Sequence, residues 1–416
     1  MGSLGFVPIS DFSVKRLNFI ALLIAAFMTP YLLLAYSDLF AQVMPLNDVL
    51  LYGYWLQQMQ LGEPLLGLNQ DFVYPYPSLL PMVLAKLLGG SAGIVVGWVS
   101  LVAILNTIAV GVLTSWGEGG RRAMSAALFW IGFLLLLGPS GIGRIDAISA
   151  AVSVFGLVAL SKDKVALAVS LFTFGAWIKI WPFALALSAF LSNRKKQLVA
   201  LAASATVAAV LIFAVAAGAN GSLFSFIFKQ GGRGIQIESP IAMIWIWAAK
   251  LGAPETKAGI YYDKEIITNQ VYGTWVAEVA MLMTAVMFIA LLITVGLAVR
   301  AIRAGAKRNE VFAVTSLTAI LDLIVFNKVG SPQFMAWLAL PIIALIIFEV
   351  QKLVIPVLGT LLIALTTNLV YPIAYMDLMG LGNFSITLLT LRNALLVALL
   401  VYANLRLGAL AKQTKR

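Results

Sequence analysis

Apolar runs of about 20 residues recur along most of the chain and are separated by short polar segments. A helix that crosses roughly 30 Å of hydrocarbon needs about 20 apolar residues, and the runs lack the two-residue alternation of barrel strands. Unpaired peptide groups are costly in hydrocarbon, so spanning segments must be helices or a closed barrel. The pattern therefore predicts an all-α polytopic membrane protein. The predicted helices are 16–37, 91–115, 123–138, 145–160, 198–217, 271–300, 309–326, 333–349, 352–372 and 384–405.

Two further segments are harder to interpret as single crossings. Residues 77–89 are too short, and residues 165–191 lie between two basic clusters with Lys179 and Pro182 in their middle. Proline removes a backbone donor and clashes with the preceding turn, so two half-helices meeting near mid-membrane are expected there. The chain then has 11–13 membrane helices in a single domain, residues 1–416, without an internal repeat.

Composition and charge agree with a membrane protein. Hydrophobic residues make up 62% of the chain and charged residues 11%, with a mean hydropathy of +0.99. The net charge of +11 is gathered in short clusters between apolar runs, which is typical of cytoplasmic loops that contact anionic lipid head groups. Nucleic acid is not an expected partner. The clusters are Lys15–Arg16, Arg121–Arg122, Lys162 and Lys164, Arg194–Lys195–Lys196, Arg300, Arg303, Lys307 and Arg308, and Lys412, Lys415 and Arg416.

This charge pattern places two long loops outside the cell, at 38–77 and 218–270, and predicts a multi-pass protein of the plasma membrane. The run at 17–36 is long and has no small-residue cleavage site, so a retained helix is expected rather than a signal peptide.

The residue types present restrict the possible chemistry. The chain has no Cys and no His, which excludes disulfides, Cys or His metal ligands and a His acid or base. It also lacks DxD, GxxxxGK[ST] and GxSxG motifs. Catalysis would therefore rest on carboxylates, Lys, Arg, Tyr and amides, with no metal and no cofactor expected.

The first long loop combines carboxylates with aromatic side chains and is the first candidate for chemistry. Asp48 and Asp71 lie in it, and either could act as a base. The rings nearby could stack on sugars, although membrane-interface anchoring is the more ordinary role of any single Tyr or Trp. These rings are Tyr52, Trp55, Tyr74 and Tyr76, and Tyr54 lies among them in the sequence.

The second long loop contains a glycine-flanked arginine. Gly231, Gly232 and Gly234 surround Arg233, so the backbone could approach a ligand while the guanidinium grips a phosphate. Glu238 could orient that arginine. A plain tight turn is the alternative interpretation.

Several ionisable residues interrupt apolar runs, where each costs about 2.5 kcal/mol or more at the bilayer centre. They are Arg144, Asp146, Lys179, Asp322, Lys328 and Arg392. Arg144 and Asp146 could pair with each other, and Arg392 could pair with Asp377 or bind a carbonyl. A structural ion pair accounts for any one of them, but together they predict a polar cavity near the external helix ends.

Five motifs in order resemble glycosyltransferase family 87. They are NDVLLYGYWLQQMQLGEPLL with FVYPYPSLLPMVLAKL, GIGRIDAISAAVSVFGLVAL, AWIKIWPFALALSAFLSNRKK, RGIQIESP and SPQFMAWLALP, within residues 45–341. The resemblance implies a GT-C bundle with juxtamembrane helices in its external loops, and transfer from polyprenyl-phosphate sugars. The best-known members are actinobacterial α-mannosyltransferases of phosphatidylinositol mannosides and related glycans, so mannose is the expected sugar.

The resemblance also implies roles for particular residues. Asp48 corresponds to the catalytic carboxylate of the first loop. Glu238 and Gln333, which lie in the later motifs, are further candidates for contact with sugar or acceptor. Asp71 would shape the acceptor side or cap the next helix. Some relatives use a histidine near the site, and Lys328 could replace it here.

These roles fit the chemistry of transfer from a lipid phosphate. A base must take the acceptor proton, and cations must stabilise the leaving phosphate. In falling order, Arg233, Lys179, Lys328 and Arg144 are candidates for the phosphate site. The partners would be a polyprenyl-phosphate sugar, a glycolipid or lipid-linked glycan acceptor and membrane lipids, with inversion at the sugar.

Two other functions are open. A transporter or lipid flippase would also account for intramembrane charges and a broken helix, but not for an acidic, aromatic first loop, and no two related halves are found. A scaffold for envelope assembly accounts less well for polar residues concentrated in the external loops.

Overall fold

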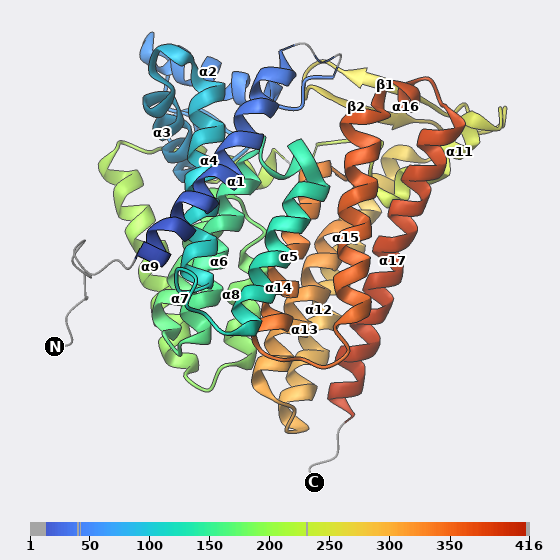
Figure 1. Ribbon diagram of the computed structural model, residues 1–416. Helices are drawn as coiled ribbons and strands as arrows, with labels where there is room; N and C mark the ends of the chain where they lie inside the picture. The colour runs from blue at the N-terminus through green and yellow to red at the C-terminus, as the bar shows by residue number, and fades with distance from the viewer. Residues whose placement is uncertain (1–13, 40, 42, 230–231, 413–416) are drawn as a thin grey trace.

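The computed structural model describes residues 14–39, 41, 43–229 and 232–412, so the predictions made for Gly231, Lys415 and Arg416 lie outside its description. The described chain is an all-α bundle, in which seven helices are long and apolar enough to cross a membrane (Figure 1). The prediction of a polytopic α-helical membrane protein is confirmed at this level. The long helices are α1 Val14–Asp38, α4 Ile94–Leu113, α5 Arg121–Leu137 with its continuation η4 Gly138–Gly141, α9 Lys196–Ala216, α12 Val276–Arg303, α15 Val354–Asn368 with its continuation η8 Leu369–Ile373, and α17 Asn383–Ala411.

Other apolar helices fill the interior between these long ones. They are α6 Ile145–Ser161, α7 Val165–Ile178, α8 Phe183–Ser192, α13 Arg308–Val325 and α14 Ala339–Ile347, the last preceded by the 3₁₀ segment η7 Pro332–Leu338. Most of α13 is buried. Its Asp322 accepts a hydrogen bond from Thr294 Oγ1 of α12 at 2.6 Å, so this intramembrane carboxylate joins two helices.

The helix break expected near Pro182 is present. Lys179 has extended backbone after α7, and Pro182 is the residue before α8. At about 1.5 Å per residue, the 14 residues of α7 and 10 residues of α8 reach roughly 21 and 15 Å, less than the thickness of a bilayer. The break between α7 and α8 therefore lies within the thickness of the bundle, and it places Lys179 in the interior.

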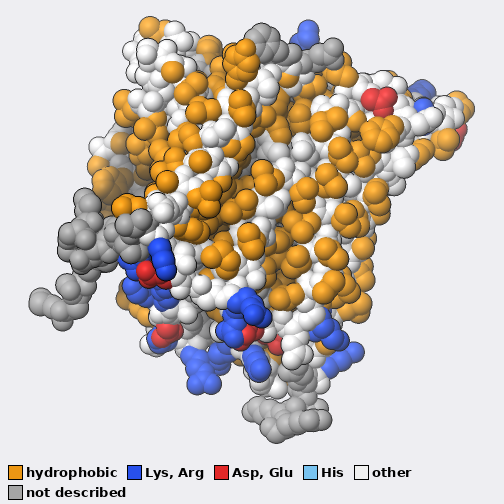
Figure 2. Space-filling view, viewed as in Figure 1, with side chains coloured by type: hydrophobic (Ala, Val, Ile, Leu, Met, Phe, Trp, Pro, Cys, Tyr) orange, Lys and Arg blue, Asp and Glu red, His pale blue; other side chains and the backbone are white. Residues whose placement is uncertain are grey.

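Basic residues gather at one end of the bundle, which we call the basic end (Figure 2). Ion pairs tie its turns together: Arg16 with Glu118, Arg122 with Glu349, and Arg406 with Glu310. Apolar side chains cover the face between the two ends, as expected where helices meet lipid (Figure 2).

The opposite end carries most of the additional short elements. They are α2 Asn47–Gln60, the 3₁₀ turn η2 Tyr76–Ser78, α3 Leu79–Gly89, η5 Gly221–Phe224, α10 Ser225–Phe228, η6 Pro240–Ala242, α11 Met243–Lys250, β1 Gly259–Asp263, β2 Thr268–Tyr272 and α16 Tyr375–Met379. Segment 77–89 forms a short helix that packs along α4. A Cβ on Gly97 of α4 would lie 1.8 Å from the carbonyl oxygen of Ala85, so this close contact requires glycine.

The helix predicted from residue 271 begins at Val276 instead. Residues Thr268–Tyr272 form β2, which pairs with β1 in an antiparallel hairpin from Gly259↔Tyr272 to Asp263↔Thr268. The Val271 N–H also donates to the Ile235 carbonyl at 3.0 Å. The hairpin and this contact with the Ile235 carbonyl hold residues 268–272 in an extended strand, which suits its Thr, Val and Tyr side chains, so the helix begins only after it.

Candidate functional site

The start of α2 places a carboxylate at the end of the bundle opposite the basic end. Leu46 N donates to Asp38 Oδ1 at 3.1 Å, which fixes the short connection from α1. Asp48 follows in the first turn of α2, where the helix dipole favours a negative charge. Its side chain is 37% exposed and can therefore reach a ligand.

Arg144 holds the Asp48 carboxylate. Its Nε lies 2.7 Å from Asp48 Oδ2, while Nη1 donates to the carbonyls of Pro45 and Gly143 and Nη2 donates to the Tyr371 hydroxyl. Charge-assisted bonds of this kind are among the stronger ones in proteins. Arg144 is therefore occupied with positioning Asp48 and the α1–α2 connection.

The possible pairing of Arg144 with Asp146 is wrong. Arg144 has extended backbone before α6, whereas Asp146 lies in the first turn of that helix, and the two side chains have separate partners. Asp146 Oδ1 accepts a hydrogen bond from Trp337 Nε1 at 2.7 Å, and its Oδ2 lies 3.8 Å from Lys179 Nζ. Asp146 is 1% exposed, so this pair is deeply buried.

Lys179 reaches the same region from the break between α7 and α8. Its ammonium lies 4.5 Å from the centre of the Tyr74 ring and 5.8 Å from that of Phe334. A cation over a ring face is stabilised by the ring quadrupole. The Lys179 ammonium therefore lies against the rings of Tyr74 and Phe334.

Aromatic rings near the carboxylate pack against one another. The ring of Trp55 lies 5.8 Å from that of Tyr52, 5.0 Å from that of Phe72 and 6.3 Å from that of Tyr74. The Tyr52 hydroxyl accepts a hydrogen bond from Ile145 N at 3.1 Å. Burial, followed by the charge of Asp48, raises the pKa of Tyr74.

Not every predicted ring can meet a sugar. Tyr52 is 0% exposed, so the prediction that it stacks on a sugar is wrong, and its ring is part of the packing. The Tyr76 hydroxyl donates to the Val210 carbonyl at 2.7 Å, which joins this loop to α9. Trp55 and Tyr74 are partly exposed and remain candidates.

The second long loop brings Arg233 to the same region. Gln236 N donates to the Lys328 carbonyl at 2.9 Å, and Ser331 Oγ donates to Gln236 Oε1 at 3.0 Å. Arg233 is within electrostatic reach of Asp48 and Lys179, and its charge adds to burial in lowering the pKa of Lys328. Burial also lowers the pKa of Arg233, whose Nε is buried without a hydrogen bond in the described part of the chain.

We call these residues together the charged cluster. Its members are Asp48, Arg144, Asp146, Lys179, Arg233 and Lys328. Four cations meet two carboxylates, so the cluster is positive and suited to an anionic ligand. Among the described residues no group of three or more Asp or Glu side chains is placed to hold a metal ion.

Glu238 lies outside the charged cluster. Its backbone carbonyl accepts from Arg392 Nη2, and its carboxyl contacts Tyr375 and Gln236. The prediction that it orients Arg233 is therefore wrong, whereas Arg392 does bind a carbonyl. Burial raises the pKa of Glu238 to about 7.

Asp71 and Gln333 also have defined places. Asp71 Oδ2 lies 3.3 Å from Lys229 Nζ, with both side chains half-exposed, so Asp71 belongs to a surface ion pair. It does not cap the next helical turn, which begins after Pro75 without a side-chain cap. Gln333 is partly buried in the first turn of η7.

Trp337 and Tyr371 contact the charged cluster but were not singled out from the sequence. Trp337 orients Asp146 and stacks on Trp181, with ring centres 5.7 Å apart. Tyr371 binds Arg144 and precedes Pro372. Tyr–Pro pairs also occur at Tyr74 and Tyr76 in the first long loop, and this repeated pair could have indicated Tyr371.

No family model and no curated protein sequence matches the chain. The resemblance of residues 45–341 to glycosyltransferase family 87 therefore stays a prediction.

Proposed function

We propose that this protein is an integral-membrane glycosyltransferase that moves a sugar, mannose by preference, from a polyprenyl-phosphate donor to a lipid-linked glycan acceptor. The observation that carries the proposal is the charged cluster itself. A partly exposed carboxylate, fixed by Arg144, lies within electrostatic reach of Lys179 and Arg233. The motif resemblance across residues 45–341 points to the same class of reaction and to a GT-C bundle.

The reaction divides between the carboxylate and the cations. Asp48 accepts the proton of the acceptor hydroxyl while that oxygen attacks the anomeric carbon. The bond from this carbon to the phosphate oxygen breaks, and polyprenyl phosphate leaves with the electron pair. Attack opposite the phosphate inverts the configuration, so a β-linked donor gives an α-linked product.

The cations stabilise the charge that develops on the leaving phosphate. Arg233, Lys179 and Lys328 supply this stabilisation. Arg144 already has four polar partners and acts on Asp48 instead. Preformed positive charge is effective here because Lys179 and Lys328 are largely shielded from water. Trp55 and Tyr74 would contact the sugar.

Sidedness follows from the charge distribution. The positive-inside rule assigns the basic end to the cytoplasm, so the charged cluster would work at the external face of the plasma membrane. A polyprenyl donor could then remain in the bilayer while its phosphate enters the cluster.

The test uses purified protein, polyprenyl-phosphate mannose and a mannosylated lipid acceptor. Asp48→Asn is expected to lower the transfer rate by about 10²- to 10⁴-fold, the usual contribution of a positioned base. Asp71→Asn is the matched control, because this exposed residue is paired with Lys229, and it should change the rate by less than about twofold. Full activity of Asp48→Asn would remove Asp48 from the base role.

Transport of a lipid-linked or small polar substrate is the second candidate. It is favoured by the broken α7–α8 segment, which carries Lys179 into the interior beside Asp146. Substrate flux in proteoliposomes, together with no transfer from any polyprenyl-phosphate sugar, would replace the transferase proposal with this one.

A further inference from the structure

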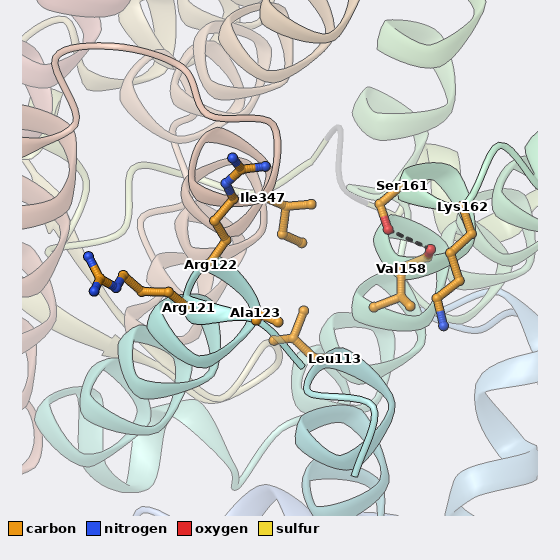
Figure 3. A pocket seen from close by; sticks show the side chains of 9 residues that line it. Leu113, Arg121, Arg122, Ala123, Val158, Ser161, Lys162 and Ile347 are labelled. Carbon is orange, nitrogen blue, oxygen red and sulfur yellow. Dashed lines mark hydrogen bonds between the residues drawn. The ribbon is translucent and has the colours of Figure 1, made fainter. Parts of the chain in front are cut away.

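A cavity of about 490 Å³ lies at the basic end, on the side of the bundle away from the charged cluster. It is formed by the end of α4, the start of α5, the end of α6 and the end of α14 (Figure 3). Small-molecule sites commonly measure about 300–1,000 Å³, so this cavity can hold a head group or a metabolite of similar size. The proposed transferase reaction uses none of its residues.

The lining divides into an apolar part and a basic part. Leu113, Ala123, Val158 and Ile347 supply apolar surface between the helices (Figure 3). The basic side chains are Arg121, Arg122 and Lys162. A ligand that matches both parts has an anionic group joined to an apolar or aliphatic portion.

Positive charge remains available at this cavity. Arg122 pairs with Glu349, but within the described chain neither Arg121 nor Lys162 forms an ion pair. The Ser161 hydroxyl at the cavity wall is occupied, because it donates to the Val158 carbonyl at 2.8 Å (Figure 3). Three cations against one carboxylate leave a net positive site.

We propose that this cavity binds a phosphate-bearing anion, a phosphodiester or phosphate monoester whose neighbouring aliphatic part lies on Leu113, Val158 and Ile347. Arginine and lysine recognise phosphate oxygens through charge-assisted hydrogen bonds. Two sources share this chemistry. One is the head group of an anionic phospholipid, which is at hand because the basic end lies at a membrane surface. The other is a soluble phosphorylated metabolite.

The experiment measures binding to the full chain after delipidation in detergent. Native mass spectrometry counts bound phosphatidylglycerol against phosphatidylcholine, and calorimetry titrates glycerol 3-phosphate. We expect preferential binding of one phosphatidylglycerol if the source is lipid, or saturable binding of glycerol 3-phosphate if it is soluble. Equal retention of the two lipids together with no binding of glycerol 3-phosphate would overturn the proposal.

Variants assign the binding to this cavity. Arg121→Gln combined with Lys162→Gln is expected to weaken binding about 10-fold or more, through two lost charge-assisted contacts. Arg303→Gln combined with Lys412→Gln removes the same charge from exposed positions at the basic end that do not line the cavity, and should leave binding within about twofold. An equal loss of binding in the two double variants would show that only net charge matters and would overturn the assignment.

A third variant fills the cavity without changing charge. Ala123→Met adds volume at the partly buried wall and should also weaken binding about 10-fold. Unchanged binding in this variant, with an unchanged thermal unfolding midpoint, would exclude the cavity as the site. Transfer activity is not a readout of this experiment, so the outcome is independent of the proposed function.

Discussion

The buried pair of Asp146 and Lys179 is expected to contribute a measurable coupling energy to the stability of the bundle. Asp146 Oδ2 lies 3.8 Å from Lys179 Nζ, and the two side chains are 2% and 15% exposed. At an effective dielectric constant of about 20, unit charges about 4 Å apart attract by roughly 4 kcal/mol. Loss of one partner leaves the other charge buried, which typically costs about 3–5 kcal/mol.

Asp146→Asn isolates the charge, because the amide oxygen can still accept the hydrogen bond from Trp337. We expect this variant to lower the free energy of unfolding by about 3 kcal/mol. Lys179→Met should cost a similar amount. The double variant removes both charges, so its cost should fall short of the sum of the single costs by about 2 kcal/mol or more.

The assay is equilibrium unfolding in mixed detergent micelles, monitored by tryptophan fluorescence. Asp163→Asn is the matched control, because Asp163 forms an exposed ion pair with Lys195 at 2.7 Å, and it should shift the free energy by less than about 1 kcal/mol. The reasoning is refuted if Asp146→Asn costs less than about 1 kcal/mol, or if the two single effects simply add.

Three further predictions concern positioning, pH and packing. Arg144→Gln should slow sugar transfer by about 5- to 50-fold, because Asp48 loses a charge-assisted contact with Arg144. The partial exposure of Asp48 already weakens this contact, which limits the effect. An unchanged rate in the transfer assay would contradict the prediction. Burial raises the pKa of Glu238 from its ordinary 4.5 to about 7, so its contribution to stability is complete below pH 4.5 and is lost as pH rises toward 7. Thermal midpoints between pH 4.5 and 8 should fall over that window and become flatter in Glu238→Gln, whereas identical profiles would exclude this residue as the cause. Gly97→Ala should lower the thermal unfolding midpoint, since its Cβ would meet an α3 carbonyl oxygen at 1.8 Å. Gly296→Ala, on the open surface of α12, should be neutral or stabilising. Equal effects of the two variants would contradict the close-contact explanation.

The polar residues of the charged cluster could be found from the sequence, but their partners could not. Asp48, Arg144, Lys179, Arg233 and Lys328 are conspicuous because charges are rare in apolar surroundings. The structure pairs Arg144 with Asp48 across 96 residues and leaves Asp146, two positions away, to Lys179. Adjacency in sequence misled here because extended backbone at Arg144 and helix at Asp146 direct the side chains apart.

Aromatic residues show the same limit. Their abundance in the first loop predicted sugar contact or interface anchoring, yet Tyr52 is fully buried and its hydroxyl accepts a hydrogen bond from the Ile145 amide. The exposure of an aromatic ring depends on which other segments pack against it. A local sequence pattern does not contain that information. Trp337 and Tyr371, from the last third of the chain, reach the charged cluster only through the packing of the bundle.

The sequence by itself determined the membrane class, the broken segment at Lys179–Pro182 and the gathering of basic residues between apolar runs. These features follow from local costs: backbone groups and charges are expensive in hydrocarbon, and proline ends a helix. Tertiary structure decided that Glu238 serves a separate network, that residues 268–272 form a strand, and that a basic cavity exists beside α5. Each of these depends on contacts beyond the local sequence pattern, from a paired strand to helices far apart in the chain, and their free energy exists only once those segments have met.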